Sequence, residues 1–176
     1  KTVFDQVVDA LKDLGKSKVF VHVSSPCSSG SPLRNFRGDD TATEADVIWF
    51  DVIPHVAKYM KLGKYSSFEL PWRNAIWTHA MTTKILNQAQ HKHVAAVHLC
   101  STGSMTKDGE PVGKVLKFTS NSKLMVGRLA KDFGQCHCTQ KHAGLTNVDW
   151  AETAFYNENL AVSIVRGALD ALRNDG

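Results

Sequence analysis

The sequence has few cysteines and no long apolar run, and each shortage excludes a class of protein. Four cysteines occur among 176 residues, which is too few for the disulfide framework of a small secreted domain. No stretch of apolar residues reaches the roughly 20 that cross a bilayer as a helix. Because no secretory signal follows Lys1, we expect an intracellular protein with reduced thiols and no membrane partner.

Several signature motifs of common enzymes are also missing. The chain contains no G-x-G-x-x-G dinucleotide loop, no G-x-x-x-x-G-K-[ST] phosphate loop and no H-E-x-x-H metalloprotease helix. These shortages argue against the standard forms of dinucleotide binding, P-loop chemistry and zinc proteolysis. The formal net charge is only +4, so a polyanionic partner such as nucleic acid is permitted but not required.

The composition that remains is that of a folded domain. Hydrophobic residues make up 43% of the chain and charged residues 22%, which is typical of globular proteins. The length and the lack of a linker-like segment predict one domain spanning residues 1–176. Because the first residue is Lys1 rather than Met, we expect a processed product or a piece of a longer polypeptide.

Apolar periodicity changes repeatedly between the spacing of helices and that of strands. Predicted helices occupy residues 2–14, 47–62, 74–90, 120–133 and 150–173, and predicted strands occupy residues 19–23, 65–70, 94–100 and 114–119. This alternation predicts a three-layer α/β fold, with a mostly parallel, twisted sheet flanked by helices in a Rossmann-like arrangement. The turn-rich residues 101–113 are compatible with an antiparallel pairing of the last two strands.

One cysteine occupies a position where α/β enzymes often place reactive groups. Cys27 lies in a loop rich in Ser, Pro and Gly that follows the strand 19–23, and ligands bind where the strands of such sheets end. A thiol is nucleophilic only as its thiolate, which backbone N–H groups and the nearby Arg34 and Arg37 would stabilise. Cys27 is therefore either a nucleophile or an inert loop residue.

A carboxylate lies near the end of the next predicted strand. Glu69 belongs to the segment Phe-Glu-Leu-Pro and should face the same sheet edge as Cys27 if the two strands are parallel. A desolvated carboxyl there would have a raised pKa and could donate a proton or hold a base. The alternative is an edge glutamate paired with Lys64 or Arg73.

The order of these motifs resembles the catalytic region of the cytosine-5 DNA methyltransferases. The loop Ser25-Pro26-Cys27-Ser28 resembles the Pro-Cys nucleophile loop of that family, and the strand end at Glu69 resembles its Glu-Asn-Val motif. The final helix, YNENLAVSIVRGAL, resembles the closing motif of the family. A similar architecture also resembles methyltransferase-like domains in the polyproteins of mobile elements.

The resemblance implies a definite chemistry on nucleic acid. Cys27 would add to C6 of a flipped cytosine, Glu69 would contact N3, and S-adenosylmethionine would methylate C5. Substrate contacts would come from Pro26, Ser28, Arg34, Lys114 and Lys117. Residues 1–17 lack the Phe-x-Gly-x-Gly cofactor loop of the family. This implies a truncated chain, a different way of binding the cofactor, or the loss of methylation.

A second group of reactive residues predicts a metal site. Cys136, Cys138 and His142 fall within seven residues of an irregular segment, and thiolates and imidazoles are zinc ligands. A structural zinc site needs four ligands, and Cys100 or His98 could supply the fourth. The alternative is a set of surface thiols and a solvated histidine.

Three functions are therefore compatible with the sequence. The first is a methyltransferase-like domain that acts on nucleic acid through Cys27 and Glu69. The second is a non-catalytic, zinc-stabilised α/β module that binds nucleic acid or protein. The third is a cysteine hydrolase, in which Cys27 would pair with a histidine.

Overall fold

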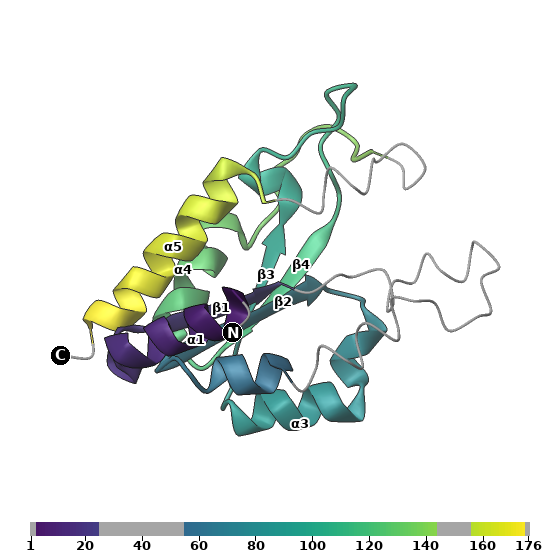
Figure 1. Ribbon diagram of the computed structural model, residues 1–176. Helices are drawn as coiled ribbons and strands as arrows, with labels where there is room; N and C mark the ends of the chain where they lie inside the picture. Colours follow the sequence, from purple (N-terminus) through teal and green to yellow (C-terminus); the bar gives the residue numbers. More distant parts are fainter. Residues whose placement is uncertain (1–2, 25–54, 144–155, 175–176) are drawn as a thin grey trace.

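Helices lie on both faces of a central β-sheet in the computed structural model (Figure 1). The structure describes residues 3–24, 55–143 and 156–174. Its helices are α1 (Val3–Leu14), α3 (Ala80–Gln88), α4 (Lys123–Phe133) and α5 (Glu158–Arg173), with a further helical stretch at residues 55–60. Its strands are β1 (Phe20–Ser24), β2 (Tyr65–Pro71), β3 (His93–His98) and β4 (Val115–Ser120). Short 3-10 turns are η1 (Lys16–Lys18), η3 (Ala75–Thr78) and η4 (Leu99–Thr102).

The strands form one mixed sheet in the order β1-β2-β4-β3. β1 and β2 pair in parallel, whereas β4 pairs antiparallel with both β2 and β3. Three strands thus run in one direction, and β4 lies between β2 and β3 in the reverse direction. The α/β class is confirmed, but the expected mostly parallel, Rossmann-like sheet is corrected to a mixed one.

The connection between β3 and β4 explains this reversal. Parallel strands need a crossover of a dozen or more residues, usually a helix that packs over the sheet. Here the chain instead forms η4, a left-handed turn at Gly103 (φ 89°) and a tight turn in which the Gly109 N–H donates to the Thr106 carbonyl oxygen. The chain therefore returns beside β3, and the antiparallel pairing considered for this region is confirmed.

Two hydrophobic cores fill the two faces of the sheet, because alternate side chains of each strand point to opposite faces. One core packs under α4 and α5 and includes Phe118, Leu129 and Leu160. The other packs against α3 and the helical residues 55–60 and includes Met60 and Phe68. Figure 1 shows α4 and α5 on one side of the sheet and α3 on the other. The helices therefore form layers on both faces, as expected.

Side-chain caps determine where the two C-terminal helices begin. The Ser122 hydroxyl accepts a hydrogen bond from the third N–H of α4 (3.3 Å), and Asn157 Oδ1 accepts one from the third N–H of α5 (3.0 Å). The predicted helix 74–90 is divided into η3 and α3. The parts of predicted helices at residues 47–54 and 150–155 lie outside the described residues.

Candidate metal centre

Four potential metal ligands converge near the end of β3. The ligand atoms of Cys100, Cys136, Cys138 and His142 all lie within 4.8 Å of one another. Cys100 belongs to η4, directly after β3, whereas the other three belong to the irregular segment that follows α4. The cluster can therefore hold a metal ion, and Cys100 rather than His98 supplies the fourth donor.

The turn after β3 determines where Cys100 lies. In η4 the Thr102 hydroxyl donates a hydrogen bond to the Leu99 carbonyl oxygen (2.7 Å). Leu99 and Thr102 are buried and anchor this turn in the core. Cys100 is itself only 8% exposed, so its side chain is largely removed from water.

The end of α4 brings the other cysteines to η4. Gly134 follows the last residue of α4, and its N–H donates to the Ala130 carbonyl oxygen (2.9 Å). A Cβ at Gly134 would collide with the same carbonyl oxygen, so a larger residue would displace the chain here. The Ser101 hydroxyl donates to the Gln135 carbonyl oxygen, which ties η4 to the segment that carries Cys136.

The turn before β4 positions the histidine of the cluster. The Ala143 N–H donates to the Pro111 carbonyl oxygen (3.0 Å). A Cβ at Gly113 would lie only 2.9 Å from the Cβ of His142, so the close approach of the two segments requires glycine. His142 is therefore held in place by a part of the chain that precedes α4.

Two distances within the cluster are close to those between the ligands of a tetrahedral zinc ion. Cys136 Sγ lies 3.5 Å from Cys100 Sγ and 3.3 Å from His142 Nε2. With Zn–S bonds of about 2.3 Å and Zn–N bonds of about 2.0 Å, neighbouring ligand atoms of a tetrahedron lie roughly 3.5–3.8 Å apart. Three thiolates and an imidazole are also soft donors, which suit zinc better than magnesium or calcium.

The thiols of the cluster have different environments. Burial, together with the neighbouring Cys136 and Cys138 thiols, raises the pKa of Cys100 to about 12. The pKa of Cys136 is lowered, chiefly by a hydrogen bond from the backbone of Cys138. Bound thiolates need compensating positive charge, which a dication would supply.

The structure describes only part of the other site that the sequence predicts. Cys27, Pro26, Ser28 and Arg34 lie outside the described residues. Glu69 is described, is only 4% exposed and pairs in register with Ser24, the last residue of β1. Glu69 is therefore a buried residue at the carboxyl end of the parallel pair β1–β2.

The Glu69 carboxylate accepts two hydrogen bonds within the fold. Its Oε2 accepts from the Tyr156 hydroxyl (2.7 Å) and from the Ser24 hydroxyl (3.0 Å). Burial raises the pKa of the Glu69 carboxyl, while these hydrogen bonds and the charge of Lys114 act in the opposite direction. The expected rise in pKa by desolvation is confirmed.

Tyr156 connects Glu69 to a half-buried histidine. His22 Nε2 lies 3.0 Å from the Tyr156 hydroxyl, and His22 Nδ1 lies 2.7 Å from the Ser67 hydroxyl. Because the single hydroxyl proton of Tyr156 is donated to Glu69, His22 must donate from Nε2 and accept at Nδ1. Burial lowers the pKa of His22 to about 4, so the ring is neutral. Tyr156 carried no signal in the sequence, because its role depends on tertiary packing.

Lys114 and Lys117, which the family resemblance assigns to one substrate site, lie on opposite faces of the sheet because side chains alternate along a strand. Lys114 precedes β4, and its charge acts on Glu69. Lys117 pairs in register with Leu70, and its ammonium lies 4.5 Å from the centroid of the Trp77 ring. The structure therefore brings Lys114, but not Lys117, to the Glu69 face of the sheet.

The fold and the cluster define an α/β domain with a mixed four-stranded sheet and a potential metal site of three cysteines and one histidine. Comparison of the chain with protein-family models, curated proteins and solved structures gives no significant match. None of the described helices is long and apolar enough to cross a membrane. The function must therefore be inferred from the residues of the chain itself.

Proposed function

We propose that the chain is a non-catalytic α/β binding module whose fold is completed by a structural Zn²⁺ at Cys100, Cys136, Cys138 and His142. The convergence of four soft donors within 4.8 Å carries this proposal. Four protein ligands complete a tetrahedral site and leave no position for a reacting water, which distinguishes structural from catalytic zinc.

The metal would stabilise a part of the fold that has little regular structure. Residues 134–143 contain no helix or strand, so their backbone is not held by a continuous hydrogen-bond ladder. Zinc binding couples directly to folding, because an unfolded chain offers no preformed site. The ion would therefore join this segment to η4 and, through it, to the end of β3.

We favour nucleic acid over protein as the partner of the module. The chain has a formal net charge of +4, and Lys and Arg contacts to phosphate release counterions. Binding of a short oligonucleotide, followed by fluorescence anisotropy, should therefore weaken steeply as the salt concentration rises. Affinity that is independent of salt would argue against contacts to phosphate, and absence of binding would argue for a different partner.

Metal analysis of the purified chain tests the zinc site. We expect about one zinc per chain and a lower ratio in Cys136→Ser. Cys27→Ser is the matched control, because it removes a thiol that is not part of the cluster. The cobalt-substituted protein should show a thiolate-to-cobalt charge-transfer band, which Cys136→Ser weakens. Equal metal content in the wild type and Cys136→Ser would contradict the proposal.

A second candidate function, methyl transfer to cytosine, is favoured by one observation. The register of β1 and β2 pairs Glu69 with Ser24, and Ser24 precedes Cys27 by three residues. In this candidate function Cys27 is the nucleophile, Glu69 contacts N3 of the base, and S-adenosylmethionine is the methyl donor. Lys114 would contribute positive charge near the same strand end.

A covalent trapping experiment separates this candidate from the zinc module. An oligonucleotide with a mechanism-based cytosine analogue should form an adduct with the wild type and with Cys136→Ser, but not with Cys27→Ser. S-Adenosylmethionine should bind to all three proteins. If the wild type forms no adduct, Cys27 is not a nucleophile towards cytosine, and the zinc module remains as the function.

A further inference from the structure

We propose that a pocket at the other end of the sheet binds a small organic molecule carrying a phosphate or carboxylate group. The pocket has a volume of about 260 Å³ and lies between η1, the helical residues 55–60 and the end of α3. Its residues Gly63 and Lys64 precede β2, whereas Glu69 lies towards the carboxyl end of β2 and Cys100 follows the carboxyl end of β3. The pocket is therefore separate from the metal centre and from Glu69.

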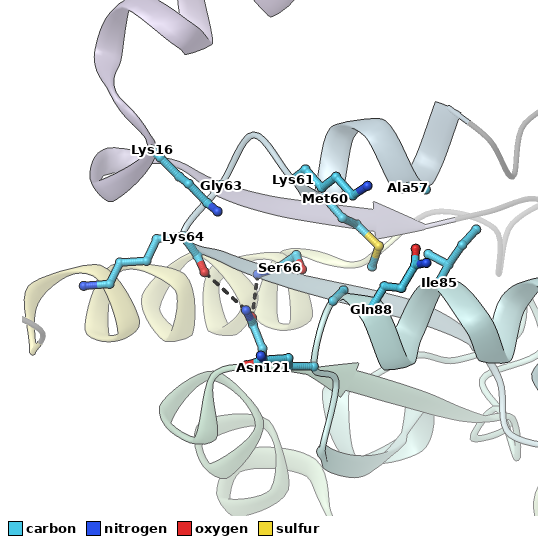
Figure 2. Close-up of a pocket in the computed structure, with 12 residues that line it drawn as sticks. Lys16, Ala57, Met60, Lys61, Gly63, Lys64, Ser66, Ile85, Gln88 and Asn121 are labelled. Atoms are coloured by element: carbon cyan, nitrogen blue, oxygen red, sulfur yellow. Dashed lines mark hydrogen bonds between the residues drawn. The ribbon is translucent and has the colours of Figure 1, made fainter.

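The pocket carries positive charge. Lys16, Lys61 and Lys64 line it, and no Asp or Glu occurs among its described lining residues. Figure 2 shows Lys16 and Lys61 approaching from two different elements, whereas the Lys64 side chain points away. In the described part of the chain, no ion pair joins Lys16 or Lys61 to a carboxylate. An anion would therefore meet two cations whose charge is not already compensated there.

The floor of the pocket is held by hydrogen bonds within the protein. Asn121 Oδ1 accepts from the Ser66 N–H (2.8 Å), and Asn121 Nδ2 donates to the Lys64 carbonyl oxygen (3.2 Å), as Figure 2 shows. The Lys64 N–H donates to the Lys16 carbonyl oxygen (2.9 Å), which keeps η1 beside the start of β2. Because these contacts exist without a ligand, little conformational entropy would be lost on binding.

Gln90 lines the pocket in a backbone conformation that favours glycine. Its φ is 56°, the only positive φ of a non-glycine residue in the part of the chain that the structure describes. It follows α3 in a Schellman motif, in which its N–H donates to the Asn87 carbonyl oxygen and the His91 N–H donates to that of Leu86. A side chain in this conformation is strained. We therefore expect the Gln90 amide to contact the ligand.

The remaining lining determines the size and character of the ligand. Ala57, Met60, Ile85 and Ala89 give the pocket an apolar surface, which would contact an uncharged part of the ligand. Pockets for drug-sized molecules have volumes of about 300–1,000 Å³, so this pocket suits a smaller molecule. A single ring or short chain with one anionic group has the required chemistry.

Titration of the zinc-loaded full chain with phenyl phosphate tests the proposal. Backbone amide NMR signals of Ser66, Gln90 and Asn121 should shift, and the double variant Lys16→Gln/Lys61→Gln should weaken binding about tenfold or more. Lys58→Gln is the matched control, because Lys58 is exposed on residues 55–60 but does not line the pocket. Lys16 and Lys61 are exposed as well, so the control differs from them in its position outside the pocket, and it should change the affinity by less than about twofold.

Three comparisons distinguish binding in the pocket from unspecific attraction of an anion to the lysines of the surface. Inorganic phosphate should bind more weakly than phenyl phosphate if the apolar surface takes part, and benzoate shows whether a carboxylate is preferred. Gln90→Gly should fold normally and bind more weakly than the wild type. Equal weakening in Lys58→Gln and in the double variant would overturn the proposal, as would unchanged affinity in the double variant or no binding of either aromatic anion.

Discussion

Cys100 and Cys136 hold their sulfur atoms 3.5 Å apart, although one directly follows β3 and the other follows α4. Two thiols at this distance gain only a weak S–H hydrogen bond. As two ligands of one zinc ion, the same atoms would be joined by much stronger bonds. The junction between β3 and the segment after α4 should therefore depend on metal.

Removal of the metal should lower the thermal stability of the chain. A ligand that binds only the folded state stabilises it by about 2.7 kcal/mol at a free concentration of 100 times its Kd. For a domain of this size, that corresponds to roughly 5–10 °C in Tm. Circular dichroism melting with and without a chelator measures the shift. Cys136→Ser should melt at the same temperature in both conditions, and a wild type insensitive to the chelator would rule out a structural metal.

Two glycines, one inside α4 and one directly after it, should respond in opposite ways to substitution by alanine. A Cβ at Gly134 would collide with the Ala130 carbonyl oxygen, so Gly134→Ala should lower the free energy of unfolding by about 1–3 kcal/mol and reduce zinc content. A Cβ at Gly127, inside α4, would meet nothing within 4 Å. Gly127→Ala should therefore stabilise the chain by about 0.5–1 kcal/mol. Urea unfolding measures both effects, and equal responses would contradict the packing argument.

The half-buried His22 should make the fold sensitive to mild acid. Its pKa is lowered by burial from 6.5 to about 4, so the unfolded state takes up the proton first as the pH falls. The free energy of unfolding should therefore decrease between pH 6.5 and about 4 and lose at most about 3 kcal/mol from this residue. Burial also lowers the pKa of His91 to about 4, which adds a contribution of the same sign.

Urea unfolding across this pH range measures the dependence. His22→Gln should make the slope shallower by up to about one proton, because the residue that gains a proton on unfolding is gone. His55→Gln, which removes an exposed imidazole, is the control. A slope that is the same in His22→Gln and in the wild type would show that His22 is protonated equally in the folded and unfolded states.

Asn157 joins α5 to η4 and should be sensitive to the loss of its amide. Its Oδ1 caps α5, while its Nδ2 donates to the carbonyl (2.9 Å) and hydroxyl (2.8 Å) oxygens of Thr102. Asn157→Ala should lower the free energy of unfolding by about 1–2 kcal/mol. Asn157→Asp keeps the capping acceptor and should lose less. An alanine variant as stable as the wild type would contradict the capping role.

Periodicity and ligand chemistry were sufficient to predict the α/β class and three residues of the potential metal site. Side chains on one face of a helix or strand follow the geometry of that element alone, so buried positions can be read from spacing. Cys136, Cys138 and His142 are neighbours in sequence, and so they needed only a fourth donor. Cys100 is a candidate because it ends the predicted strand 94–100, although in the structure it belongs to η4.

The strand order and the Glu69 network could not be predicted in the same way. The position of β4 between β2 and β3 depends on which connection crosses the sheet, and neither spacing nor composition encodes that choice. Tyr156 contacts Glu69 across 87 positions of sequence, and the side to which Lys117 points depends on the register of β4. Such relationships come from packing rather than from local pattern.

The amino-acid sequence by itself therefore determined the types of element in this protein and a set of donors able to bind a soft metal, because both depend on local spacing and side-chain chemistry. Only the tertiary structure decided that Cys100, not His98, completes the cluster and that the buried Glu69 is bonded to Tyr156 and Ser24. It also brought Lys16 and Lys61 to one pocket. These outcomes depend on strand register and on how helices pack over the sheet, which contacts between distant parts of the chain determine.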